Sequence, residues 1–278
     1  MSAKIIDGKS IARKIYEEIK PQIEVYCPTL AIIQIGDDPG SSVYRRSIEK
    51  RASKLGVKTE TFLLESDITE KAIIDLIQQL NRDKNINGLI VQRPLPSHIK
   101  ENVVLDVMDP LKDIDGATSY NLGKLVKKEE GLFPSTPLGV IKILEESGFD
   151  LTGKDVTLIG RSVVVGKPLA LMLIHRNATV TVCHTKTKNL KEKCLRADLL
   201  ISAAGKPALV KSDMVKDGAF IVDVGINEVD GKIVGDVDFE SVKDKTSYLT
   251  PVPGGVGPVT VAMLFSNLIK ATRLQNEK

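Results

Sequence analysis

The sequence predicts an α/β protein of two domains, the second of which contains a Rossmann-like doubly wound parallel sheet. The length of 278 residues favours two domains, at roughly 150 residues per domain. Short, continuous apolar runs alternate with helical patterns along the chain, which is typical of βαβ units whose strands are buried on both faces. A glycine-containing loop at 160–166 follows one such run, where folds of this kind bind nucleotides.

The first βαβ series lies between residues 7 and 91. Ile11, Ile15 and Ile19 recur every fourth residue and predict an amphipathic helix. The other elements predicted in this series are a strand at 30–35, a helix at about 41–55, a strand at 59–64, a helix from about 67 with Thr69 as its cap, and a strand at 88–91. Their order predicts a mainly parallel sheet covered by helices.

The rhythm is lost between residues 92 and 136, where prolines and aspartates are frequent, and such a stretch is usually either functional or a linker. A second series follows, with a helix at 168–176 and strands at 155–159, 179–183, 199–202 and 220–224. We therefore expect a first domain of residues 1–137 and a second of residues 138–257. We expect the C-terminal helix, within 258–278, to pack back on the first domain.

Composition and charge exclude several classes of protein. The 39 basic and 36 acidic residues are spread along the chain, and a net charge of +3 is too balanced for a nucleic-acid-binding surface. No run approaches the roughly 18 apolar residues of a membrane span, and the N-terminus has no secretory signal pattern. Cys27, Cys183 and Cys194 have no metal-binding spacing, and their odd number fits a reducing compartment. We expect a cytoplasmic protein with small-molecule ligands, and no metal, nucleic-acid or membrane partner.

The loop Gly160–Gly166 is neither GxGxxG nor a P-loop, because five residues separate its glycines and Pro168 follows Lys167. By itself it fits a dinucleotide site or an ordinary βα turn equally well. The turn after the next strand, 183–188, has no carboxylate to hold the ribose hydroxyls of NAD. A solvated basic turn would look the same, but next to the glycine loop its cations favour the extra phosphate of NADP. The groups that could bind this phosphate are Arg161, His184, Thr185 and Lys186.

Five motifs follow one another along nearly the whole chain. They are Val91-Gln-Arg-Pro-Leu-Pro96, Lys112-Asp-Ile-Asp-Gly116, Pro134-Ser-Thr-Pro-Leu-Gly139, Gly160-Arg-Ser-Val-Val-Val-Gly-Lys-Pro168 and Thr250-Pro-Val-Pro-Gly-Gly-Val-Gly-Pro-Val-Thr260. In this order they resemble the bifunctional methylenetetrahydrofolate dehydrogenase/methenyltetrahydrofolate cyclohydrolases, the FolD family. The resemblance implies a homodimer in which two α/β domains flank a cleft, with folate on the N-terminal side and NADP on the C-terminal side.

The resemblance also implies roles for three residues on the folate side. Tyr44 matches a tyrosine that stacks on the folate, and Gln92 matches a glutamine beside the reacting carbon. Asp115 matches a carboxylate that accepts hydrogen bonds from the pterin ring, which suits a group able to accept a bidentate pair. Each also has an ordinary alternative, as a core aromatic, a solvated strand end and a turn former.

Further positions match the family's cofactor contacts and cleft floor. Pro251, Gly254 and Gly255 would shape the cleft floor, although structural turns use the same residue types. The residues that match cofactor contacts are Gly160, Arg161, Ser162, Thr185 and Ile226.

One position departs from the family pattern. The family carries a lysine four residues after the tyrosine, on the same helix face, and here Ile48 stands in that place. Lys50 lies about 240° around the helix from Tyr44, on another face. Arg51 is nearly in phase, but it lies roughly 10 Å along the axis and is too basic to exchange protons. Arg93 also replaces a residue that is usually leucine.

The resemblance implies a role in one-carbon metabolism: NADP-dependent oxidation of 5,10-methylenetetrahydrofolate to the methenyl cation, then hydrolysis to 10-formyltetrahydrofolate. Hydride transfer needs no proton carrier, whereas hydrolysis does, so we expect Ile48 to weaken the second step. Two alternatives are a non-catalytic NADP- or folate-binding member of the family and an unrelated NADP oxidoreductase. Retention of the tyrosine, the glutamine and the carboxylate argues against both.

Overall fold

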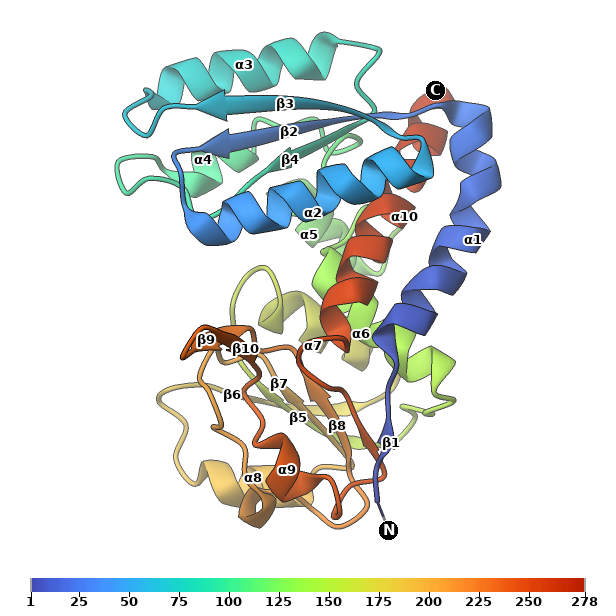
Figure 1. The fold of residues 1–278 in the computed structure, drawn as a ribbon, viewed down its shortest axis with the longest axis vertical. Coiled ribbons are helices and arrows are strands. Elements are labelled where there is room, and N and C mark those ends of the chain that lie inside the picture. Colours follow the sequence, from blue (N-terminus) through green and yellow to red (C-terminus); the bar gives the residue numbers. More distant parts are fainter. Residues whose placement is uncertain (1, 278) are drawn as a thin grey trace. The chain divides into compact units, whose positions relative to one another are not determined.

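The computed structural model describes residues 2–277, and the chain forms two compact units (Figure 1). One unit consists of Ile15–Ser135 and the chain from Leu264 onward, and we call it the three-stranded unit. The other consists of the chain up to Lys14 and Thr136–Met263, and we call it the six-stranded unit. Two of the three boundaries fall inside the helices α1 (Gly8–Tyr26) and α10 (Val256–Asn276), so each of these helices contributes residues to both units, and the third lies between Ser135 and Thr136.

The three-stranded unit has a parallel sheet in the order β3-β2-β4, with α2 and α3 on opposite sides of it (Figure 1). Besides its parts of α1 and α10, its elements are β2 (Thr29–Ile35), α2 (Pro39–Leu55), β3 (Lys58–Leu64), α3 (Glu70–Arg82), β4 (Gly88–Val91), α4 (Glu101–Leu105) and α5 (Ser119–Lys127). The predicted strands and helices of the first series are therefore confirmed. The short helices α4 and α5 lie in the stretch without rhythm and were not predicted.

The hydrophobic pattern explains why these elements form. All seven residues of β2 are buried, as its continuous apolar run predicts for a central strand covered on both faces. The helix α3 turns Ile73, Ile77 and Leu80 into the core against this sheet. Its predicted cap is confirmed, because Thr69 Oγ1 accepts a hydrogen bond from Ala72 N–H at 3.2 Å.

The six-stranded unit has a parallel sheet in the order β1-β11-β8-β7-β5-β6 and an antiparallel hairpin of β9 and β10. All strands of the second predicted series are present. The elements, besides the start of α1 and of α10, are β1 (Lys4–Ile5), α6 (Ser135–Glu146), β5 (Asp155–Ile159), α7 (Gly166–Ile174), β6 (Thr179–Cys183), α8 (Leu190–Arg196), β7 (Leu199–Ser202), η1 (Ser212–Met214), β8 (Phe220–Asp223), β9 (Asn227–Val229), β10 (Lys232–Val234), α9 (Phe239–Val242) and β11 (Tyr248–Leu249).

The N-terminal strand lies in this unit, although residues 1–137 were expected to form the first domain. β1 pairs in parallel with β11, more than 240 residues later in the chain. A strand of two residues with exposed side chains leaves no hydrophobic pattern, so the sequence gives no local sign of this pairing. The expected boundary at residue 137 also falls inside α6, which has Pro137 in its first turn, a position that suits proline.

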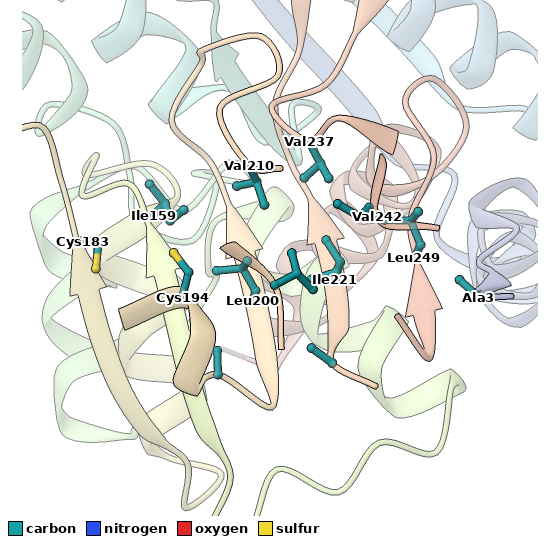
Figure 2. Close-up of a cluster of buried hydrophobic side chains, with 13 residues drawn as sticks. Ala3, Ile159, Cys183, Cys194, Leu200, Val210, Ile221, Val237, Val242 and Leu249 are labelled. Carbon is teal, nitrogen blue, oxygen red and sulfur yellow. The ribbon is translucent and has the colours of Figure 1, made fainter. Parts of the chain in front are cut away.

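One face of the six-stranded sheet packs against α8 and α9 (Figure 2). Figure 2 shows Ile159, Leu200 and Ile221, which belong to β5, β7 and β8, in one cluster with Cys194 of α8 and Val242 of α9. These side chains are almost fully buried, so this face of the sheet is covered by a closely packed core. Both buried cysteines of the chain lie in this core as free thiols.

Two further properties concern residues 2–277 only. None of the helices in this range is both long and apolar enough to cross a membrane. Nor does the range contain a group of three or more His, Cys, Asp or Glu side chains that could hold a metal ion.

Candidate active site

In the three-stranded unit, two predicted site residues lie where β4 ends. Gln92 follows β4 directly, and Leu89 within β4 forms a parallel bridge with Asp113. Asp115 is held at this strand end by its hydrogen bond with Arg93, the residue after Gln92. Apart from the single bridge at Asp113, the motif around the two aspartates is a turn, in which the Gly116 N–H donates to the Asp113 carbonyl at 3.1 Å.

Tyr44 approaches the same place from α2. The helix begins at Pro39, and the Oδ2 atom of Asp38 caps it by accepting a hydrogen bond from the N–H of Ser41 at 2.8 Å. Tyr44 is half-buried, and burial, followed by the nearby Asp115 carboxylate, raises the pKa of its phenol. The phenol therefore stays protonated at neutral pH and is available as a hydrogen-bond donor rather than as a base.

The two aspartates of the Lys112–Gly116 motif have different roles. Asp113 is fully buried, and its carboxylate is saturated by donors. These donors are the N–H groups of Ala117 (2.9 Å) and Thr118 (2.8 Å), the Thr118 hydroxyl (2.7 Å) and the Asn121 amide (3.0 Å). Asp115 accepts a hydrogen bond from Arg93 alone, at 2.6 Å, among the groups of residues 2–277. Asp113 thus shapes the turn, whereas Asp115 keeps acceptor capacity for a ligand.

Gln92 presents a donor that the described part of the chain does not satisfy. Its side chain is only 4% exposed, and its Nε2 group has no hydrogen-bond partner among residues 2–277. A buried amide N–H without a partner costs free energy, so native proteins rarely retain one unless a ligand or water completes it. This donor therefore fits a ligand that carries an acceptor next to Asp115.

The helix face that carries Tyr44 has no proton carrier at position 48. Ile48 is fully buried, one turn after Tyr44. Lys50 is exposed, and the Arg51 guanidinium lies 4.4 Å from the centroid of the Tyr16 ring in a cation–π contact. Neither cation takes the place that Ile48 occupies.

In the six-stranded unit, Gly160 and Gly166 shape the loop after β5. Gly160 has a φ of 130°, and a Cβ atom there would overlap the Ala203 carbonyl oxygen. A Cβ atom at Gly166 would overlap the Gly160 carbonyl oxygen, so the loop can close only with glycine at both positions. The helix α7 begins at Gly166, two residues earlier than predicted.

Ser162 contacts the backbone at the start of α7. Its Oγ atom accepts hydrogen bonds from the N–H groups of Val165 at 3.2 Å and of Gly166, the first residue of the helix, at 3.4 Å. The side chain of the preceding residue, Arg161, is exposed. The loop thus presents a cation next to a helix N-terminus, an arrangement that favours an anionic ligand.

Parallel pairing places the other cofactor candidates at the carboxyl ends of strands in the six-stranded sheet, as the glycine loop is. The last residue of β5 pairs with the last residues of β6 and β7, and the last residue of β7 pairs with that of β8. The glycine loop, the 183–188 turn and Ile226 therefore follow neighbouring strand ends. Thr185 and Lys186 are exposed, and His184 Nδ1 accepts the Lys186 N–H at 3.1 Å. Ile226 is 69% exposed, so its side chain is accessible to a ligand.

Two buried carboxylates behind this edge were missed by the sequence analysis. Asp236 is fully buried and accepts hydrogen bonds from the Ser202 hydroxyl at 2.9 Å and the Ala204 N–H at 2.7 Å, after β7. Asp223, at the end of β8, accepts from three backbone N–H groups, and burial raises its pKa to about 6. Asp223 anchors the loop that carries Ile226, and Asp236 anchors the neighbouring loop after β7. The sequence did contain a sign of them, since a glycine stands close to each aspartate, at Gly225 and Gly235. In the structure, a Cβ atom at Gly225 would overlap Asp236, and one at Gly235 would overlap Asp223.

The loop 250–258 follows β11 at the same edge. A Cβ atom at Gly255 would overlap backbone of Pro251, whose carbonyl accepts the Gly255 N–H at 2.9 Å, so this glycine has a structural reason. Gly254 has a φ of 107°, and no atom of the described chain lies within 4 Å of a Cβ built there. Its backbone is therefore open to close approach by a ligand.

Comparison with protein families matches both units. Residues 6–115 match the model of the tetrahydrofolate dehydrogenase/cyclohydrolase catalytic domain. Residues 134–276 match the model of the tetrahydrofolate dehydrogenase/cyclohydrolase NAD(P)-binding domain. The two matches together cover most of the chain and leave out only short segments at the ends and between them.

Individual relatives agree over the full length. The chain is 49% identical over 281 aligned positions to the bifunctional protein FolD of Campylobacter concisus, with 99% of both chains covered. The crystal structure of the bifunctional enzyme FolD from Campylobacter jejuni superposes with a TM-score of 0.96 at 45% identity, covering 99% of this chain and 100% of that one. The Trypanosoma brucei methylenetetrahydrofolate dehydrogenase-cyclohydrolase, complexed with NADP cofactor and inhibitor, gives a TM-score of 0.95 at 32% identity with both chains fully covered.

Proposed function

The chain belongs to the tetrahydrofolate dehydrogenase/cyclohydrolase family, and we propose that it oxidises 5,10-methylenetetrahydrofolate with NADP and hydrolyses the methenyl product only weakly. Membership of the family rules out the alternative of an unrelated NADP oxidoreductase. It also confirms the α/β fold with a Rossmann-like NAD(P)-binding domain. The alternative of a non-catalytic family member is tested by the NADPH assay described below.

The observation that carries the proposal is the group of polar side chains at the end of β4. Asp115 offers a carboxylate with free acceptor sites, and Gln92 offers a buried donor that has no partner among residues 2–277. Tyr44 adds a protonated phenol and an aromatic face. A pterin ring presents adjacent N–H donors, ring acceptors and a planar face, so the three side chains complement it in kind.

Hydride transfer requires the protein mainly to position its two ligands. NADP, when bound, supplies the hydride acceptor. Asp115 would hold the pterin by two parallel hydrogen bonds, and Gln92 and Tyr44 would fix the ring so that the methylene carbon keeps one orientation. No side chain needs to carry a proton during hydride transfer, so the buried Ile48 is compatible with this step.

The residues of the six-stranded unit fit NADP by the chemistry of their donors. The 183–188 turn has cations and hydroxyls and no carboxylate, and Arg161 is exposed in the loop after the neighbouring strand. We assign the 2′-phosphate to Arg161, Thr185 and their neighbours, and the rest of the cofactor to Gly160, Ser162 and Ile226. The loop residues Pro251, Gly254 and Gly255 are assigned to the substrate.

Replacing Arg161 with alanine is expected to reduce the preference for NADP over NAD. A charge-assisted hydrogen bond contributes about 1.5–3 kcal/mol, so losing one phosphate contact lowers the selectivity roughly tenfold or more. The measurement is kcat/KM for both cofactors in wild type and Arg161→Ala. Lys154→Ala is the control, because Lys154 precedes β5 and therefore lies at the amino end of this strand, whereas Arg161 follows its carboxyl end. Equal use of both cofactors by the wild type, or an unchanged ratio in Arg161→Ala, contradicts the assignment.

Dehydrogenation itself is tested by mixing the protein with NADP and methylenetetrahydrofolate and following the NADPH absorbance band. The proposal predicts continuous formation of NADPH. Tight binding of both ligands without turnover would instead identify a non-catalytic member of the family.

We also propose that the protein is a homodimer. β3 is one of the two edge strands of its sheet, and its Leu63 side chain is 63% exposed, while Val43 of the adjacent helix α2 is 61% exposed. An open parallel edge with apolar side chains is a surface that a second copy could cover. Light scattering should give the mass of two chains for wild type and of one chain for Leu63→Lys. A single-chain mass for the wild type contradicts the proposal.

We place the protein in the cytoplasm. The cysteines are free and scattered, with Cys27 exposed and Cys183 and Cys194 buried in the core, as a reducing compartment allows. Fractionation of cells that produce the protein, with activity assayed in each fraction, tests this placement.

A further inference from the structure

Arg93 lies in the candidate folate site, and the proposed chemistry gives it no role. It follows Gln92 after β4, and its Nη2 atom donates a hydrogen bond to Asp115 Oδ2 at 2.6 Å. Its Nη1 atom lies 3.8 Å from an oxygen of Glu101. The side chains of Arg93 and Asp115 are 23% and 24% exposed, so the pair is largely shielded from water, where such a bond has more effect than on an open surface.

The backbone holds Arg93 in a fixed place relative to α2. Its carbonyl oxygen lies 2.9 Å from the Ser41 hydroxyl, whose single proton is shared between this carbonyl and the Asp38 carboxylate at 2.8 Å. Ser41 is buried at the start of α2, where its N–H is bound by the capping carboxylate of Asp38. The helix that carries Tyr44 and the loop that carries Arg93 are therefore fastened together, and the guanidinium reaches Asp115 from a defined origin.

The pairing leaves half of the carboxylate free. Arg93 uses one lone pair of Oδ2, and Oδ1 receives no hydrogen bond from residues 2–277. A carboxylate has about four acceptor positions, so a bidentate pair of ligand N–H groups can still bind across Oδ1 and Oδ2. The guanidinium thus fixes the direction in which the open side of the carboxylate faces without filling it.

We propose that Arg93 is a positioning residue for folate: its guanidinium orients the Asp115 carboxylate and keeps it an acceptor for the pterin N–H groups. This inference rests on the proposed function, in which Asp115 binds the pterin. It accounts for a cation at a position that the family usually fills with leucine.

The charges around Asp115 make the role measurable by pH. Burial raises the pKa of the Asp115 carboxyl, Arg93 lowers it, and the neighbouring Asp113 raises it. Tyr44 also faces the carboxylate, and Glu101 faces Arg93 from α4. Arg93 is thus the cation that opposes protonation of Asp115, and a protonated carboxyl can no longer accept two N–H bonds. Without Arg93, folate binding should fail at a higher pH as the solution is acidified.

The experiment measures tetrahydrofolate affinity by calorimetry over a pH series in wild type, Arg93→Leu, Arg93→Lys and Asp115→Asn. We expect Arg93→Leu to weaken binding about tenfold or more at neutral pH. We also expect it to shift the acid limb of the affinity profile, which is the fall in affinity at low pH, to higher pH. Arg93→Lys should restore most of this limb, and Asp115→Asn should bind tetrahydrofolate weakly at every pH, without an acid limb. Because the same ligand is used throughout, its own titration cancels between variants. Arg82→Leu removes one cation from the end of α3 in the same unit and serves as the control.

Each outcome decides one question. Unchanged affinity and an unmoved acid limb in Arg93→Leu, with binding lost in Asp115→Asn, overturn the positioning role and leave the folate site intact. Tighter binding in Arg93→Leu overturns it as well, because Arg93 would then compete with the pterin for Asp115. Unchanged binding in Asp115→Asn overturns the assignment of Asp115 to folate, and with it the proposed site. Thermal unfolding of each variant, which should stay close to wild type, verifies that these differences arise from the site.

Discussion

Asp115→Ala is expected to abolish nearly all turnover of methylenetetrahydrofolate while NADP binds as in the wild type. Two charge-assisted hydrogen bonds of about 1.5–3 kcal/mol each would be lost, which lowers kcat/KM on the order of 10²–10⁴-fold. The cofactor is spared because Asp115 and the Gly160 loop belong to different units of the chain. The measurement combines steady-state kinetics for the folate with equilibrium titration of NADP.

Asp113→Ala provides the contrast for this prediction. The Asp113 carboxylate accepts four hydrogen bonds and is fully buried, so its removal leaves several donors unpaired and should lower the melting temperature. Within the described residues 2–277, Asp115→Ala breaks a single side-chain hydrogen bond, the one with Arg93, and this variant should melt close to the wild type. Near-normal folate turnover in Asp115→Ala would show that this aspartate is a turn former and that the site has been assigned to the wrong carboxylate.

Ile48→Lys is expected to raise hydrolysis of methenyltetrahydrofolate with little benefit to hydride transfer. During hydrolysis the attacking water loses a proton and a ring nitrogen gains one, and general acid–base help typically contributes about 10²–10⁴-fold. Ile48 lies one turn after Tyr44 on the buried face of α2, and isoleucine cannot supply this help. Methenyl decay, corrected for the protein-free reaction, is the measurement.

Ile48→Met is the matched control, since it offers a flexible side chain of comparable length without an amine. It should leave hydrolysis at the wild-type level. The ammonium at a fully buried position should lower the melting temperature of Ile48→Lys, so the gain in hydrolysis is scored on the folded fraction. Robust hydrolysis by the wild type, with no increase in Ile48→Lys, would show that another residue has taken over proton transfer.

The strands and long helices could be predicted because burial and periodicity are local signals. The run Leu30–Ile35 is continuous because the central strand is covered on both faces, and it forms β2 as expected. β1 could not be predicted, because its pairing with β11 is decided by a distant segment and by only two residues. The helices α4 and α5 were missed since 5 and 9 residues are too few for a clear helical period.

The site could be predicted by residue type but not by contact. The motif with Asp113 and Asp115 indicated a carboxylate for the pterin, yet only the hydrogen bonds separate the structural aspartate from the free one. The basic residue at 93 was visible in the sequence, but its partner was not, because Arg93 and Asp115 are 22 residues apart and meet only where the turn after Asp113 lies beside the end of β4. The buried Asp223 and Asp236 were missed for the same reason.

The central claim is that hydride transfer is retained while the step that needs a proton carrier is weakened. One measurement tests it most directly: wild-type protein is mixed with NADP and methylenetetrahydrofolate, and NADPH and the methenyl product are followed together in the same sample. The account predicts that NADPH forms steadily and that the methenyl product accumulates nearly in step with it, decaying little faster than in protein-free buffer. Steady NADPH with no accumulation of the methenyl product, or no NADPH at all, would contradict it.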